Sequence, residues 1–500
     1  MFGKKEADRI LNLIKTKKSD YWMRVREKQM LALFHKAADG VPAYKDFLKK
    51  NGVEPDKVKT LKDFQLVPPM SKKNYLRQYD LKDLCYGGTL RQALVFTSTS
   101  GSTGEPFYFP RNEQLDWQSS IYHELFLRNN SRQNLGQTLV IVGFGMGVWI
   151  GGLITFKAFE NVAKRGYPIS IITPGINKSE IFHALKTLSP NFTETILVGY
   201  PPFVKDLIDE AEDNGVNLKK INLRILNAAE SYSEKFRDYV VSKSGIKNVY
   251  LDMVNIYGTA DLGTMAFETP TTIFTRRILS KNITAFNNIF SQITKTPTLA
   301  QYNPMFTSFE EESGSILLTG DNSIPLVRYT IGDNGGVMSY KELDSRLHKS
   351  GIDLADGLKK QGLESFSNQL PVVYVYERTD LSTKLYGAII YPEHVREALQ
   401  DSRFESFLTG KFTMLTRYDD DQNQFLEINV ELKPGIKAKK SLEKLCCDTI
   451  VKNLLNKNAE YKNNHNSLAD EVTPRIIFWP YGNDTYFKSG VKQKWVKNTS

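Results

Sequence analysis

The strongest constraint on the fold is a regular alternation of short β-rich runs with amphipathic segments of helical length, between about residues 93 and 337. Alternation of this kind is typical of parallel sheets whose strands are joined by crossover helices. We therefore predict an α/β fold whose large N-terminal domain contains mixed or parallel sheets. The predicted strands are residues 93–97, 138–142, 169–173, 195–198, 224–227 and 316–319.

The length of the chain, 500 residues, predicts more than one domain, because single hydrophobic cores stop growing at about 250–300 residues. Residues 1–90 have helical periodicity and form the predicted N-terminal segment of a large domain at 1–379. A charged helical stretch at about 338–370 is interpreted as an insertion in that domain. The remainder, residues 380–500, is expected to form a small, mobile α+β C-terminal domain. Its predicted elements are a strand at 425–430 and a helix at 441–455.

An uncharged run of eighteen residues, Leu139 to Phe156, is long enough to raise the question of a membrane span. Five of its residues are glycine, which is unusual for a spanning helix. Interior parallel strands are apolar on both faces, so a continuous hydrophobic run is their usual pattern. We interpret the run as a buried strand that leads into a helix, and we expect no membrane span.

The net charge of +10 is compatible with an anionic substrate, a nucleic acid or an acidic surface. The lysines are scattered, and the densest run, residues 437–440, lacks aromatic neighbours, so we expect no nucleic-acid partner. Three cysteines, Cys85, Cys446 and Cys447, favour a reducing compartment and argue against a Cys-rich zinc site. Because the first thirty residues are charged and lack the apolar core of a signal peptide, we expect a cytoplasmic protein.

A loop rich in hydroxyl groups and glycine follows the predicted strand at 93–97. Backbone N–H groups and hydroxyls of such a loop can converge on an anion, and glycine permits positive φ angles and close approach. The Gly-Lys-Ser/Thr ending of a Walker loop is absent, so this is a phosphate-loop candidate of another type. Its candidate binding residues are Thr99, Ser100, Gly101, Ser102, Thr103 and Gly104.

With Pro106, this loop resembles the phosphate loop of adenylate-forming enzymes, in particular the branch similar to phenylacetate–coenzyme A ligases. Further motifs of that superfamily follow in order, so the resemblance covers essentially the whole chain. Glu105 and Asp261 stand where the pattern commonly has a lysine and a glutamate, and segments 268–305 and 338–370 exceed the pattern. The other matching motifs are 227–231, 257–261, 325–333, 377–392 and 489–494.

The resemblance implies a role for each motif. One segment lines the adenine, the Tyr-Gly segment contacts the nucleotide and carries a magnesium ligand, and an aspartate with an arginine holds the ribose. A hinge aspartate separates the domains, and a lysine near the C-terminus is catalytic. The aromatic and glycine residues after the strand at 138–142 are candidates for the acyl pocket. The assigned residues are Ala229, Glu230 and Ser231 for adenine, Tyr257, Gly258 and Thr259 for the nucleotide, Asp261 for magnesium, Asp333 and Arg378 for ribose, Asp380 for the hinge, Lys492 for catalysis, and Phe144, Gly145 and Trp149 for the substrate.

The activity that the resemblance implies is ATP-dependent conversion of a carboxylic acid, aryl or otherwise apolar, to an acyl-adenylate, followed by transfer to a thiol such as coenzyme A. Its cofactors would be ATP and Mg²⁺, with coenzyme A or phosphopantetheine as the acyl acceptor.

Three alternatives stay open. The acyl group could pass to the phosphopantetheine of an acyl carrier protein, which a basic surface would suit. Gly143, Gly145 and Gly147 after a strand suggest a dinucleotide-binding oxidoreductase, although the third glycine comes one residue too early for that fingerprint. A catalytically silent binding protein could keep the same fold.

Overall fold

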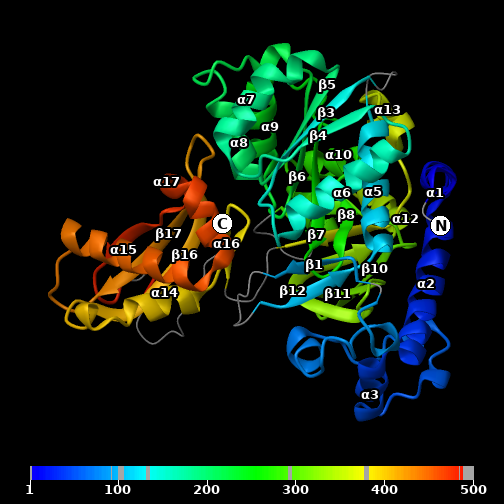
Figure 1. The fold of residues 1–500 in the computed structure, drawn as a ribbon, viewed down its shortest axis with the longest axis horizontal. Coiled ribbons are helices and arrows are strands. Elements are labelled where there is room, and N and C mark those ends of the chain that lie inside the picture. Colours follow the sequence, from blue (N-terminus) through cyan, green and yellow to red (C-terminus); the bar gives the residue numbers. More distant parts are fainter. Residues whose placement is uncertain are drawn as a thin grey trace.

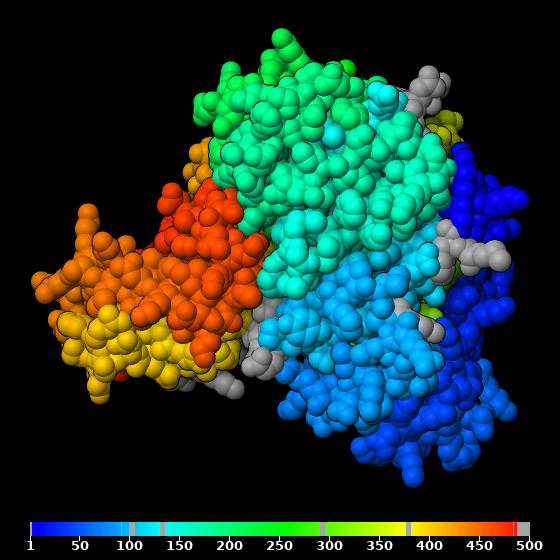
Figure 2. Space-filling model, viewed as in Figure 1, coloured from blue at the N-terminus to red at the C-terminus, as the bar shows by residue number. Residues whose placement is uncertain are grey.

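The computed structural model describes residues 3–91, 93–99, 106–130, 136–290, 296–376, 382–483 and 485–487. A large body contains everything up to residue 376, and a smaller lobe with the C-terminal elements lies beside it (Figure 1). In Figure 2 the orange-red surface of the lobe meets the green surface of the large body. The hinge predicted at Asp380 lies outside the described residues, so the domain boundary stays a prediction.

The large body is organised around a mixed sheet that has eleven strands within the described residues. Their order across the sheet is β10 (Thr307–Glu312), β11 (Ser315–Gly320), β12 (Leu326–Met338), β13 (Val372–Val375), β9 (Thr298–Gln301), β8 (Gly263–Phe267), β7 (Met253–Thr259), β6 (Leu223–Ala228), β5 (Glu194–Gly199), β3 (Thr138–Gly143) and β4 (Ile169–Ile172). Strands β4, β3, β5, β6 and β7 are parallel, and the remaining pairs are antiparallel. The predicted α/β class is confirmed.

The parallel half of the sheet has the buried, crossover-connected strands that the hydrophobic runs predict. Strands β3 and β5 are buried along their whole length because helices cover both faces of the sheet. The uncharged run from Leu139 to Phe156 is strand β3 followed by the start of a helix, as predicted. Within the described ranges, no helix combines the length and apolar character that crossing a membrane requires. The covering helices are α5 (Glu113–Arg128), α6 (Ile150–Lys164), α7 (Lys178–Thr187), α8 (Pro201–Asp209) and α9 (Glu234–Ser244).

Two of the predicted strands pair antiparallel and lie outside the parallel half of the predicted mixed sheet. Residues 316–319 belong to β11, which pairs antiparallel with β10 and β12. The strand predicted at 93–97 is β1 (Val95–Ser98), which forms a separate antiparallel hairpin with β2 (Tyr108–Arg111). Short connections can join antiparallel strands without a crossover helix, so the alternation of strand and helix does not apply there.

The N-terminal segment is helical, as predicted, and lies on the side of the sheet away from the C-terminal lobe (Figure 1). The Arg26 guanidinium donates to the Phe309 carbonyl of β10 (2.6 Å), which attaches this segment to the sheet. Met70 pairs with β12, because the Met70 N–H donates to the Arg328 carbonyl (3.0 Å) and the Met70 carbonyl accepts from the Thr330 N–H (2.8 Å). Its helices are α1 (Lys4–Thr16), α2 (Ser19–Gly40), α3 (Pro42–Lys50) and α4 (Leu61–Phe64), followed by a π-helical turn at Lys72–Leu76.

The two segments that exceed the family pattern, 268–305 and 338–370, pack against each other. They supply helices α10 (Pro270–Leu279), α11 (Ile283–Ile289), α12 (Tyr340–Lys349) and α13 (Leu354–Lys360). Buried side chains of all four helices, including Phe274, Phe286 and Leu347, form one hydrophobic cluster with strands β9 and β13. The two segments therefore build a single helical layer on the antiparallel half of the sheet.

The C-terminal lobe has the α+β composition that the sequence predicts. Strands β16 and β17 pair antiparallel, and β17 pairs parallel with β18. A small hairpin of β14 and β15 precedes this sheet and faces the large body. The elements are β14 (Thr383–Leu385), β15 (Ala388–Ile390), α14 (Pro392–Leu399), β16 (Leu408–Tyr418), β17 (Gln424–Leu432), α15 (Lys440–Lys457), α16 (Ala459–Ser467), α17 (Ala469–Val472) and β18 (Arg475–Trp479).

The helical layer is expected to contribute to global stability and not to be a loosely attached surface addition. Leu347 on α12 is 1% exposed and Leu66 is 79% exposed, so the same truncation should have different effects at the two sites. Leu347→Ala should lower the free energy of unfolding by about 3 kcal/mol, since it removes buried methyl groups and leaves a cavity. Leu66→Ala should change it by less than about 0.5 kcal/mol. Chemical denaturation measures both, and equal values would contradict the packing described here.

Candidate active site

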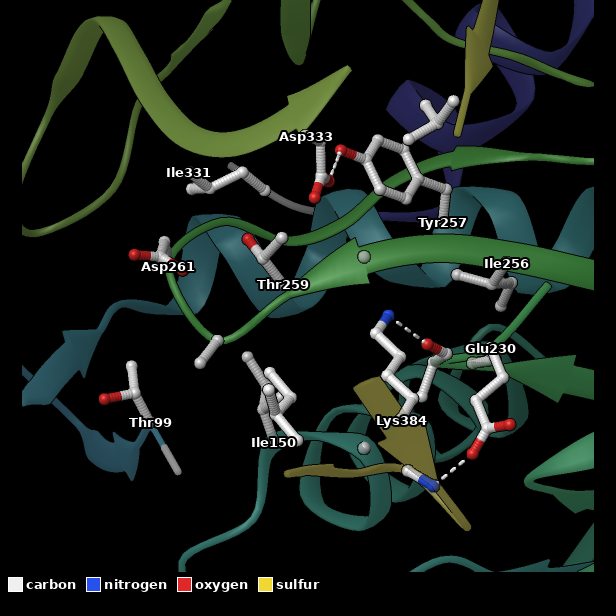
Figure 3. A pocket seen from close by; sticks show the side chains of 18 of the residues that line it. Thr99, Ile150, Glu230, Ile256, Tyr257, Thr259, Asp261, Ile331, Asp333 and Lys384 are labelled. Atoms are coloured by element: carbon white, nitrogen blue, oxygen red, sulfur yellow. Dashed lines mark hydrogen bonds between the residues drawn. The ribbon is translucent and has the colours of Figure 1, made fainter. Parts of the chain in front are cut away.

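A cavity of about 810 Å³ lies between the large body and the C-terminal lobe. It opens near the carboxyl ends of β6 and β7, the edge where α/β sheets commonly bind ligands. Figure 3 shows its lining side chains converging from β7, β12, α6 and the small hairpin of the lobe. The predicted site residues that line this one cavity are Thr99, Phe144, Trp149, Ala229, Glu230, Ser231, Tyr257, Gly258, Thr259, Asp261 and Asp333.

None of the other predicted residues is among the described residues that line the cavity. Gly145 is not among the lining residues, and a side chain there would meet Trp149 and Asn463 of α16. The other predicted positions, Ser100, Gly101, Ser102, Thr103, Gly104, Arg378, Asp380 and Lys492, lie outside the described residues.

Thr99 marks the place where the predicted phosphate loop leaves strand β1. Its N–H donates to the Phe107 carbonyl (3.0 Å), and its hydroxyl accepts from the Phe107 N–H (3.1 Å). These two bonds join the ends of the loop. The Ser98 N–H donates to the Val148 carbonyl (3.0 Å), so the same strand end also holds the segment that leads into α6.

Three basic residues of the N-terminal segment, Lys72, Lys73 and Arg77, line the cavity, and sequence reasoning missed them. They lie in and just after the π-helical turn, whose start is fixed by reciprocal bonds between Ser71 and Asn74. Their sequence signal was weak, because lysine pairs are common along this chain. Their positive charge suits a polyphosphate group.

Tyr257 on β7 and Asp333 on β12 meet across the cavity wall. The Tyr257 hydroxyl donates to Oδ2 of Asp333 at 2.5 Å (Figure 3). An ionised carboxylate has several acceptor positions, so Asp333 can accept further hydrogen bonds from a hydroxyl-bearing ligand. This arrangement fits the ribose of a nucleotide.

Asp261 lies in the turn between β7 and β8. Its Oδ1 accepts from the Tyr329 hydroxyl (2.8 Å), and the side chain is only 4% exposed. No group of three or more His, Cys, Asp or Glu side chains suited to a metal occurs among the described residues. Mg²⁺ is commonly held by one or two carboxylates together with substrate phosphates, so a single carboxylate at this edge of the cavity fits a magnesium that arrives with a nucleotide.

The segment after β6 connects the large body to the C-terminal lobe. Ala229 has a positive φ of 76°, and its carbonyl accepts from the Lys384 ammonium (2.7 Å). The Glu230 carboxylate accepts from the Gly387 N–H and from the Gln424 amide (2.6 Å). Glu230 therefore has a docking contact with the lobe that its predicted adenine role does not include.

The apolar side of the cavity is formed by the segment before α6 and by α6 itself. Phe144 is buried and packs edge to face against Tyr200, with ring centroids 4.9 Å apart. Trp149, Ile150 and Ile154 extend this wall along the start of α6. Such a wall suits the apolar part of a small ligand.

Comparisons with known proteins agree with this geometry. No protein-family model matches the chain. The fold is that of 2-hydroxyisobutyryl-CoA ligase, solved with 2-HIB-AMP and CoA in the thioesterification state; the TM-score is 0.61 at 14% identity, covering 97% of this chain and 91% of that chain. The postadenylation state of the same ligase with 2-HIB-AMP gives a TM-score of 0.52 at 13% identity, covering the same shares. At this level of identity, these likenesses show the fold of the chain.

Two curated relatives, both called phenylacetate-coenzyme A ligase, define the resemblance more closely. The protein from Aromatoleum evansii is 22% identical over 228 residues, 45% of this chain and 48% of the relative. The protein from Thermus thermophilus is 23% identical over 242 residues, 48% of this chain and 50% of the relative. The chain spans about half the length of the curated relatives it matches. These similarities confirm the predicted resemblance to the phenylacetate–coenzyme A ligase-like branch of the adenylate-forming superfamily.

The contact between the lobe and the cavity can be tested with two matched glycines. Gly387 and Gly410 have nearly the same positive φ, 83° and 82°, so alanine introduces similar backbone strain at each. A Cβ at Gly387 would lie 2.4 Å from the Tyr200 ring, whereas nothing lies within 4 Å of one at Gly410. Gly387→Ala should therefore displace the lobe and speed amide hydrogen exchange at residues 203–204 and 228–231. Gly410→Ala should leave exchange there unchanged, and equal exchange in both variants would contradict the docking contact.

Proposed function

We propose that the protein is an AMP-forming acid–thiol ligase, which activates a carboxylic acid with ATP and transfers the acyl group to a thiol such as coenzyme A. The observation that carries the proposal is the single cavity that gathers Thr99, residues 229–231, Tyr257 and Asp333 from four separate motifs. Residues so far apart in the sequence converge around one space of a size suited to a nucleotide and a small acid.

In the first step, the substrate carboxylate attacks the α-phosphorus of ATP and pyrophosphate leaves. A protein accelerates such a transfer mainly by positioning and by stabilising charge. Asp333 and Tyr257 would hold the ribose, and Lys72, Lys73 and Arg77 would attract the phosphates. Magnesium, when bound, would neutralise phosphate charge beside Asp261. Lys492 is the proposed catalytic lysine, and Arg378 a second ribose contact.

In the second step, the thiol attacks the acyl carbonyl and AMP leaves. The higher TM-score to the thioesterification state than to the postadenylation state, 0.61 against 0.52, supports an arrangement of the lobe suited to this step. Asp380 is the proposed hinge between the two arrangements. The acceptor we favour is coenzyme A, because both curated relatives are named coenzyme A ligases.

The apolar wall of Phe144, Trp149 and Ile154 supports an aryl or other apolar acid as the substrate. A dinucleotide-binding role has less support, because α6 begins only at Ile150, after the last of the three glycines. The dinucleotide fingerprint requires the glycine turn to open the helix directly.

A panel of aryl and aliphatic acids in an ATP–pyrophosphate exchange assay tests the proposal. We expect exchange that depends on one class of acid and a coenzyme A thioester as the final product. Lys492→Ala should reduce exchange by about a hundredfold or more, the usual effect of removing a group that stabilises transition-state charge. Lys494→Ala and Lys497→Ala are the matched controls and should have little effect. Exchange that is undiminished in Lys492→Ala would refute the catalytic assignment.

The ribose contact is tested by Asp333→Asn, which keeps the size of the side chain but removes its charge. Hydrogen bonds to a charged group contribute about 1.5–3 kcal/mol, so the KM for ATP should rise about 10- to 100-fold. The exposed Asp448 of α15 provides a control, and Asp448→Asn should leave this KM unchanged. An unaltered KM in Asp333→Asn would place the ribose elsewhere.

A further inference from the structure

Glu460 is a carboxylate of the C-terminal lobe that lines the cavity, and none of the proposed binding roles uses it. It lies in the first turn of α16 and is partly buried. Helix α16 is held in place by Asn458, whose amide donates to the Ile389 carbonyl (2.9 Å), and by Asn464, whose amide donates to the Tyr386 carbonyl (2.8 Å). The backbone that carries Glu460 is therefore fixed against the small hairpin of the lobe.

The other carboxylates of the cavity already have hydrogen-bond donors. Glu230 accepts from Gly387 and Gln424, Asp261 accepts from Tyr329, and Asp333 accepts from Tyr257. Glu460 accepts no hydrogen bond from any residue in the described part of the chain. A carboxylate that faces a cavity without a donor of its own is available to a ligand.

Three charged or titratable groups interact electrostatically with Glu460. Lys384 of β14 attracts its negative charge, Glu230 repels it, and Tyr200 faces it from the start of α8. Lys384 is bonded to Ala229 of the proposed adenine segment, and Tyr200 packs on Phe144 of the proposed acyl wall. Glu460 is thus placed between the nucleotide side and the acyl side of the cavity, where an acyl group and AMP would be joined.

We propose that Glu460 is the general base of the thiol-transfer step. The Glu460 carboxylate takes the proton of the acceptor thiol as its sulfur attacks the acyl carbonyl carbon. A carbon–sulfur bond forms, the bond between the acyl carbon and the phosphate oxygen breaks, and AMP leaves with that electron pair. No oxidant or further reactant is needed. This inference rests on the proposed function and extends it to the second half-reaction.

The titration of Glu460 suits that task. Burial, followed by the attraction of Lys384 and the repulsion of Glu230, gives a net rise in the pKa of Glu460 to about 8. A base is most effective when its pKa lies near the working pH, and a thiol such as that of cysteine has an ordinary pKa of about 8.5. The two groups are therefore matched for proton transfer. Because the carboxylate is the active form, the rate of thiol transfer should increase as the pH rises through 8.

The test compares the two half-reactions in the full-length protein with an acid chosen by the exchange assay. Glu460→Gln should leave ATP–pyrophosphate exchange within twofold of the unaltered protein. Its rate of coenzyme A thioester formation at pH 7.5 should fall by about a hundredfold or more, the usual contribution of a general base. The loss should shrink above pH 9, where the thiol ionises without help. Glu460→Asp should retain the rise in rate through pH 8 at a lower maximum.

The exposed Glu443 of α15 is the matched control, and Glu443→Gln should alter neither half-reaction. Undiminished thioester formation in Glu460→Gln would overturn the proposal, and so would equal losses in both half-reactions, which indicate a structural role. If the unaltered protein shows no exchange with any acid, the proposed function itself fails. If the unaltered protein shows exchange and Glu460→Gln does not slow thioester formation, only the general-base proposal fails.

Discussion

The Glu268 carboxylate, which is completely buried, supports the part of β7 whose Asn255 lines the cavity. It pairs with Arg237 of α9 and with Arg276 of α10, each at 2.8 Å, and it accepts from the Asn255 N–H of β7 at 2.9 Å. The Arg276 guanidinium also donates to the Tyr232 carbonyl. Glu234 also pairs with both arginines, with Arg237 at 3.0 Å and with Arg276 at 3.5 Å, so two carboxylates balance two guanidinium charges. Removal of one partner from such a cluster costs about 3–5 kcal/mol.

This buried cluster connects the unusual helical layer to the candidate active site. Arg276 belongs to α10, one of the four helices of this layer, and its contact with Tyr232 holds the end of the segment that carries Glu230. The Asn255 amide donates to the Glu230 carbonyl at 2.9 Å and supports the same segment from β7. The layer thus has a physical role at the site. It keeps the backbone of residues 229–231 in place, including the positive φ of Ala229. The C-terminal lobe docks against this segment.

The sequence predicts the parallel half of the sheet well, because strands buried on both faces carry a local signal in their apolar runs. It does not predict the antiparallel pairing of β10, β11 and β12, because these consecutive strands are joined by short connections and no crossover helix marks them. The site residues also divide into those with a local sequence signal and those without one. Tyr257, Asp261 and Asp333 lie in recognisable motifs and reach the cavity. Lys72, Lys73 and Glu460 resemble the many other charged residues of the chain, and only the fold brings them to the cavity.

Charge is distributed unevenly around the cavity, and this asymmetry bears on how a nucleotide would lie in it. Lys72, Lys73 and Arg77 are positioned by the pairing of Met70 with β12, the strand that carries Asp333. Phosphates attracted to these residues would place the ribose of the same nucleotide near Asp333 and Tyr257. Lys384 comes from the lobe and is bonded to the Ala229 carbonyl, so its charge reaches the cavity only while the lobe is docked. Among the described residues, the large body contributes Lys72, Lys73 and Arg77 to the cavity, and the lobe contributes Lys384 and Glu460.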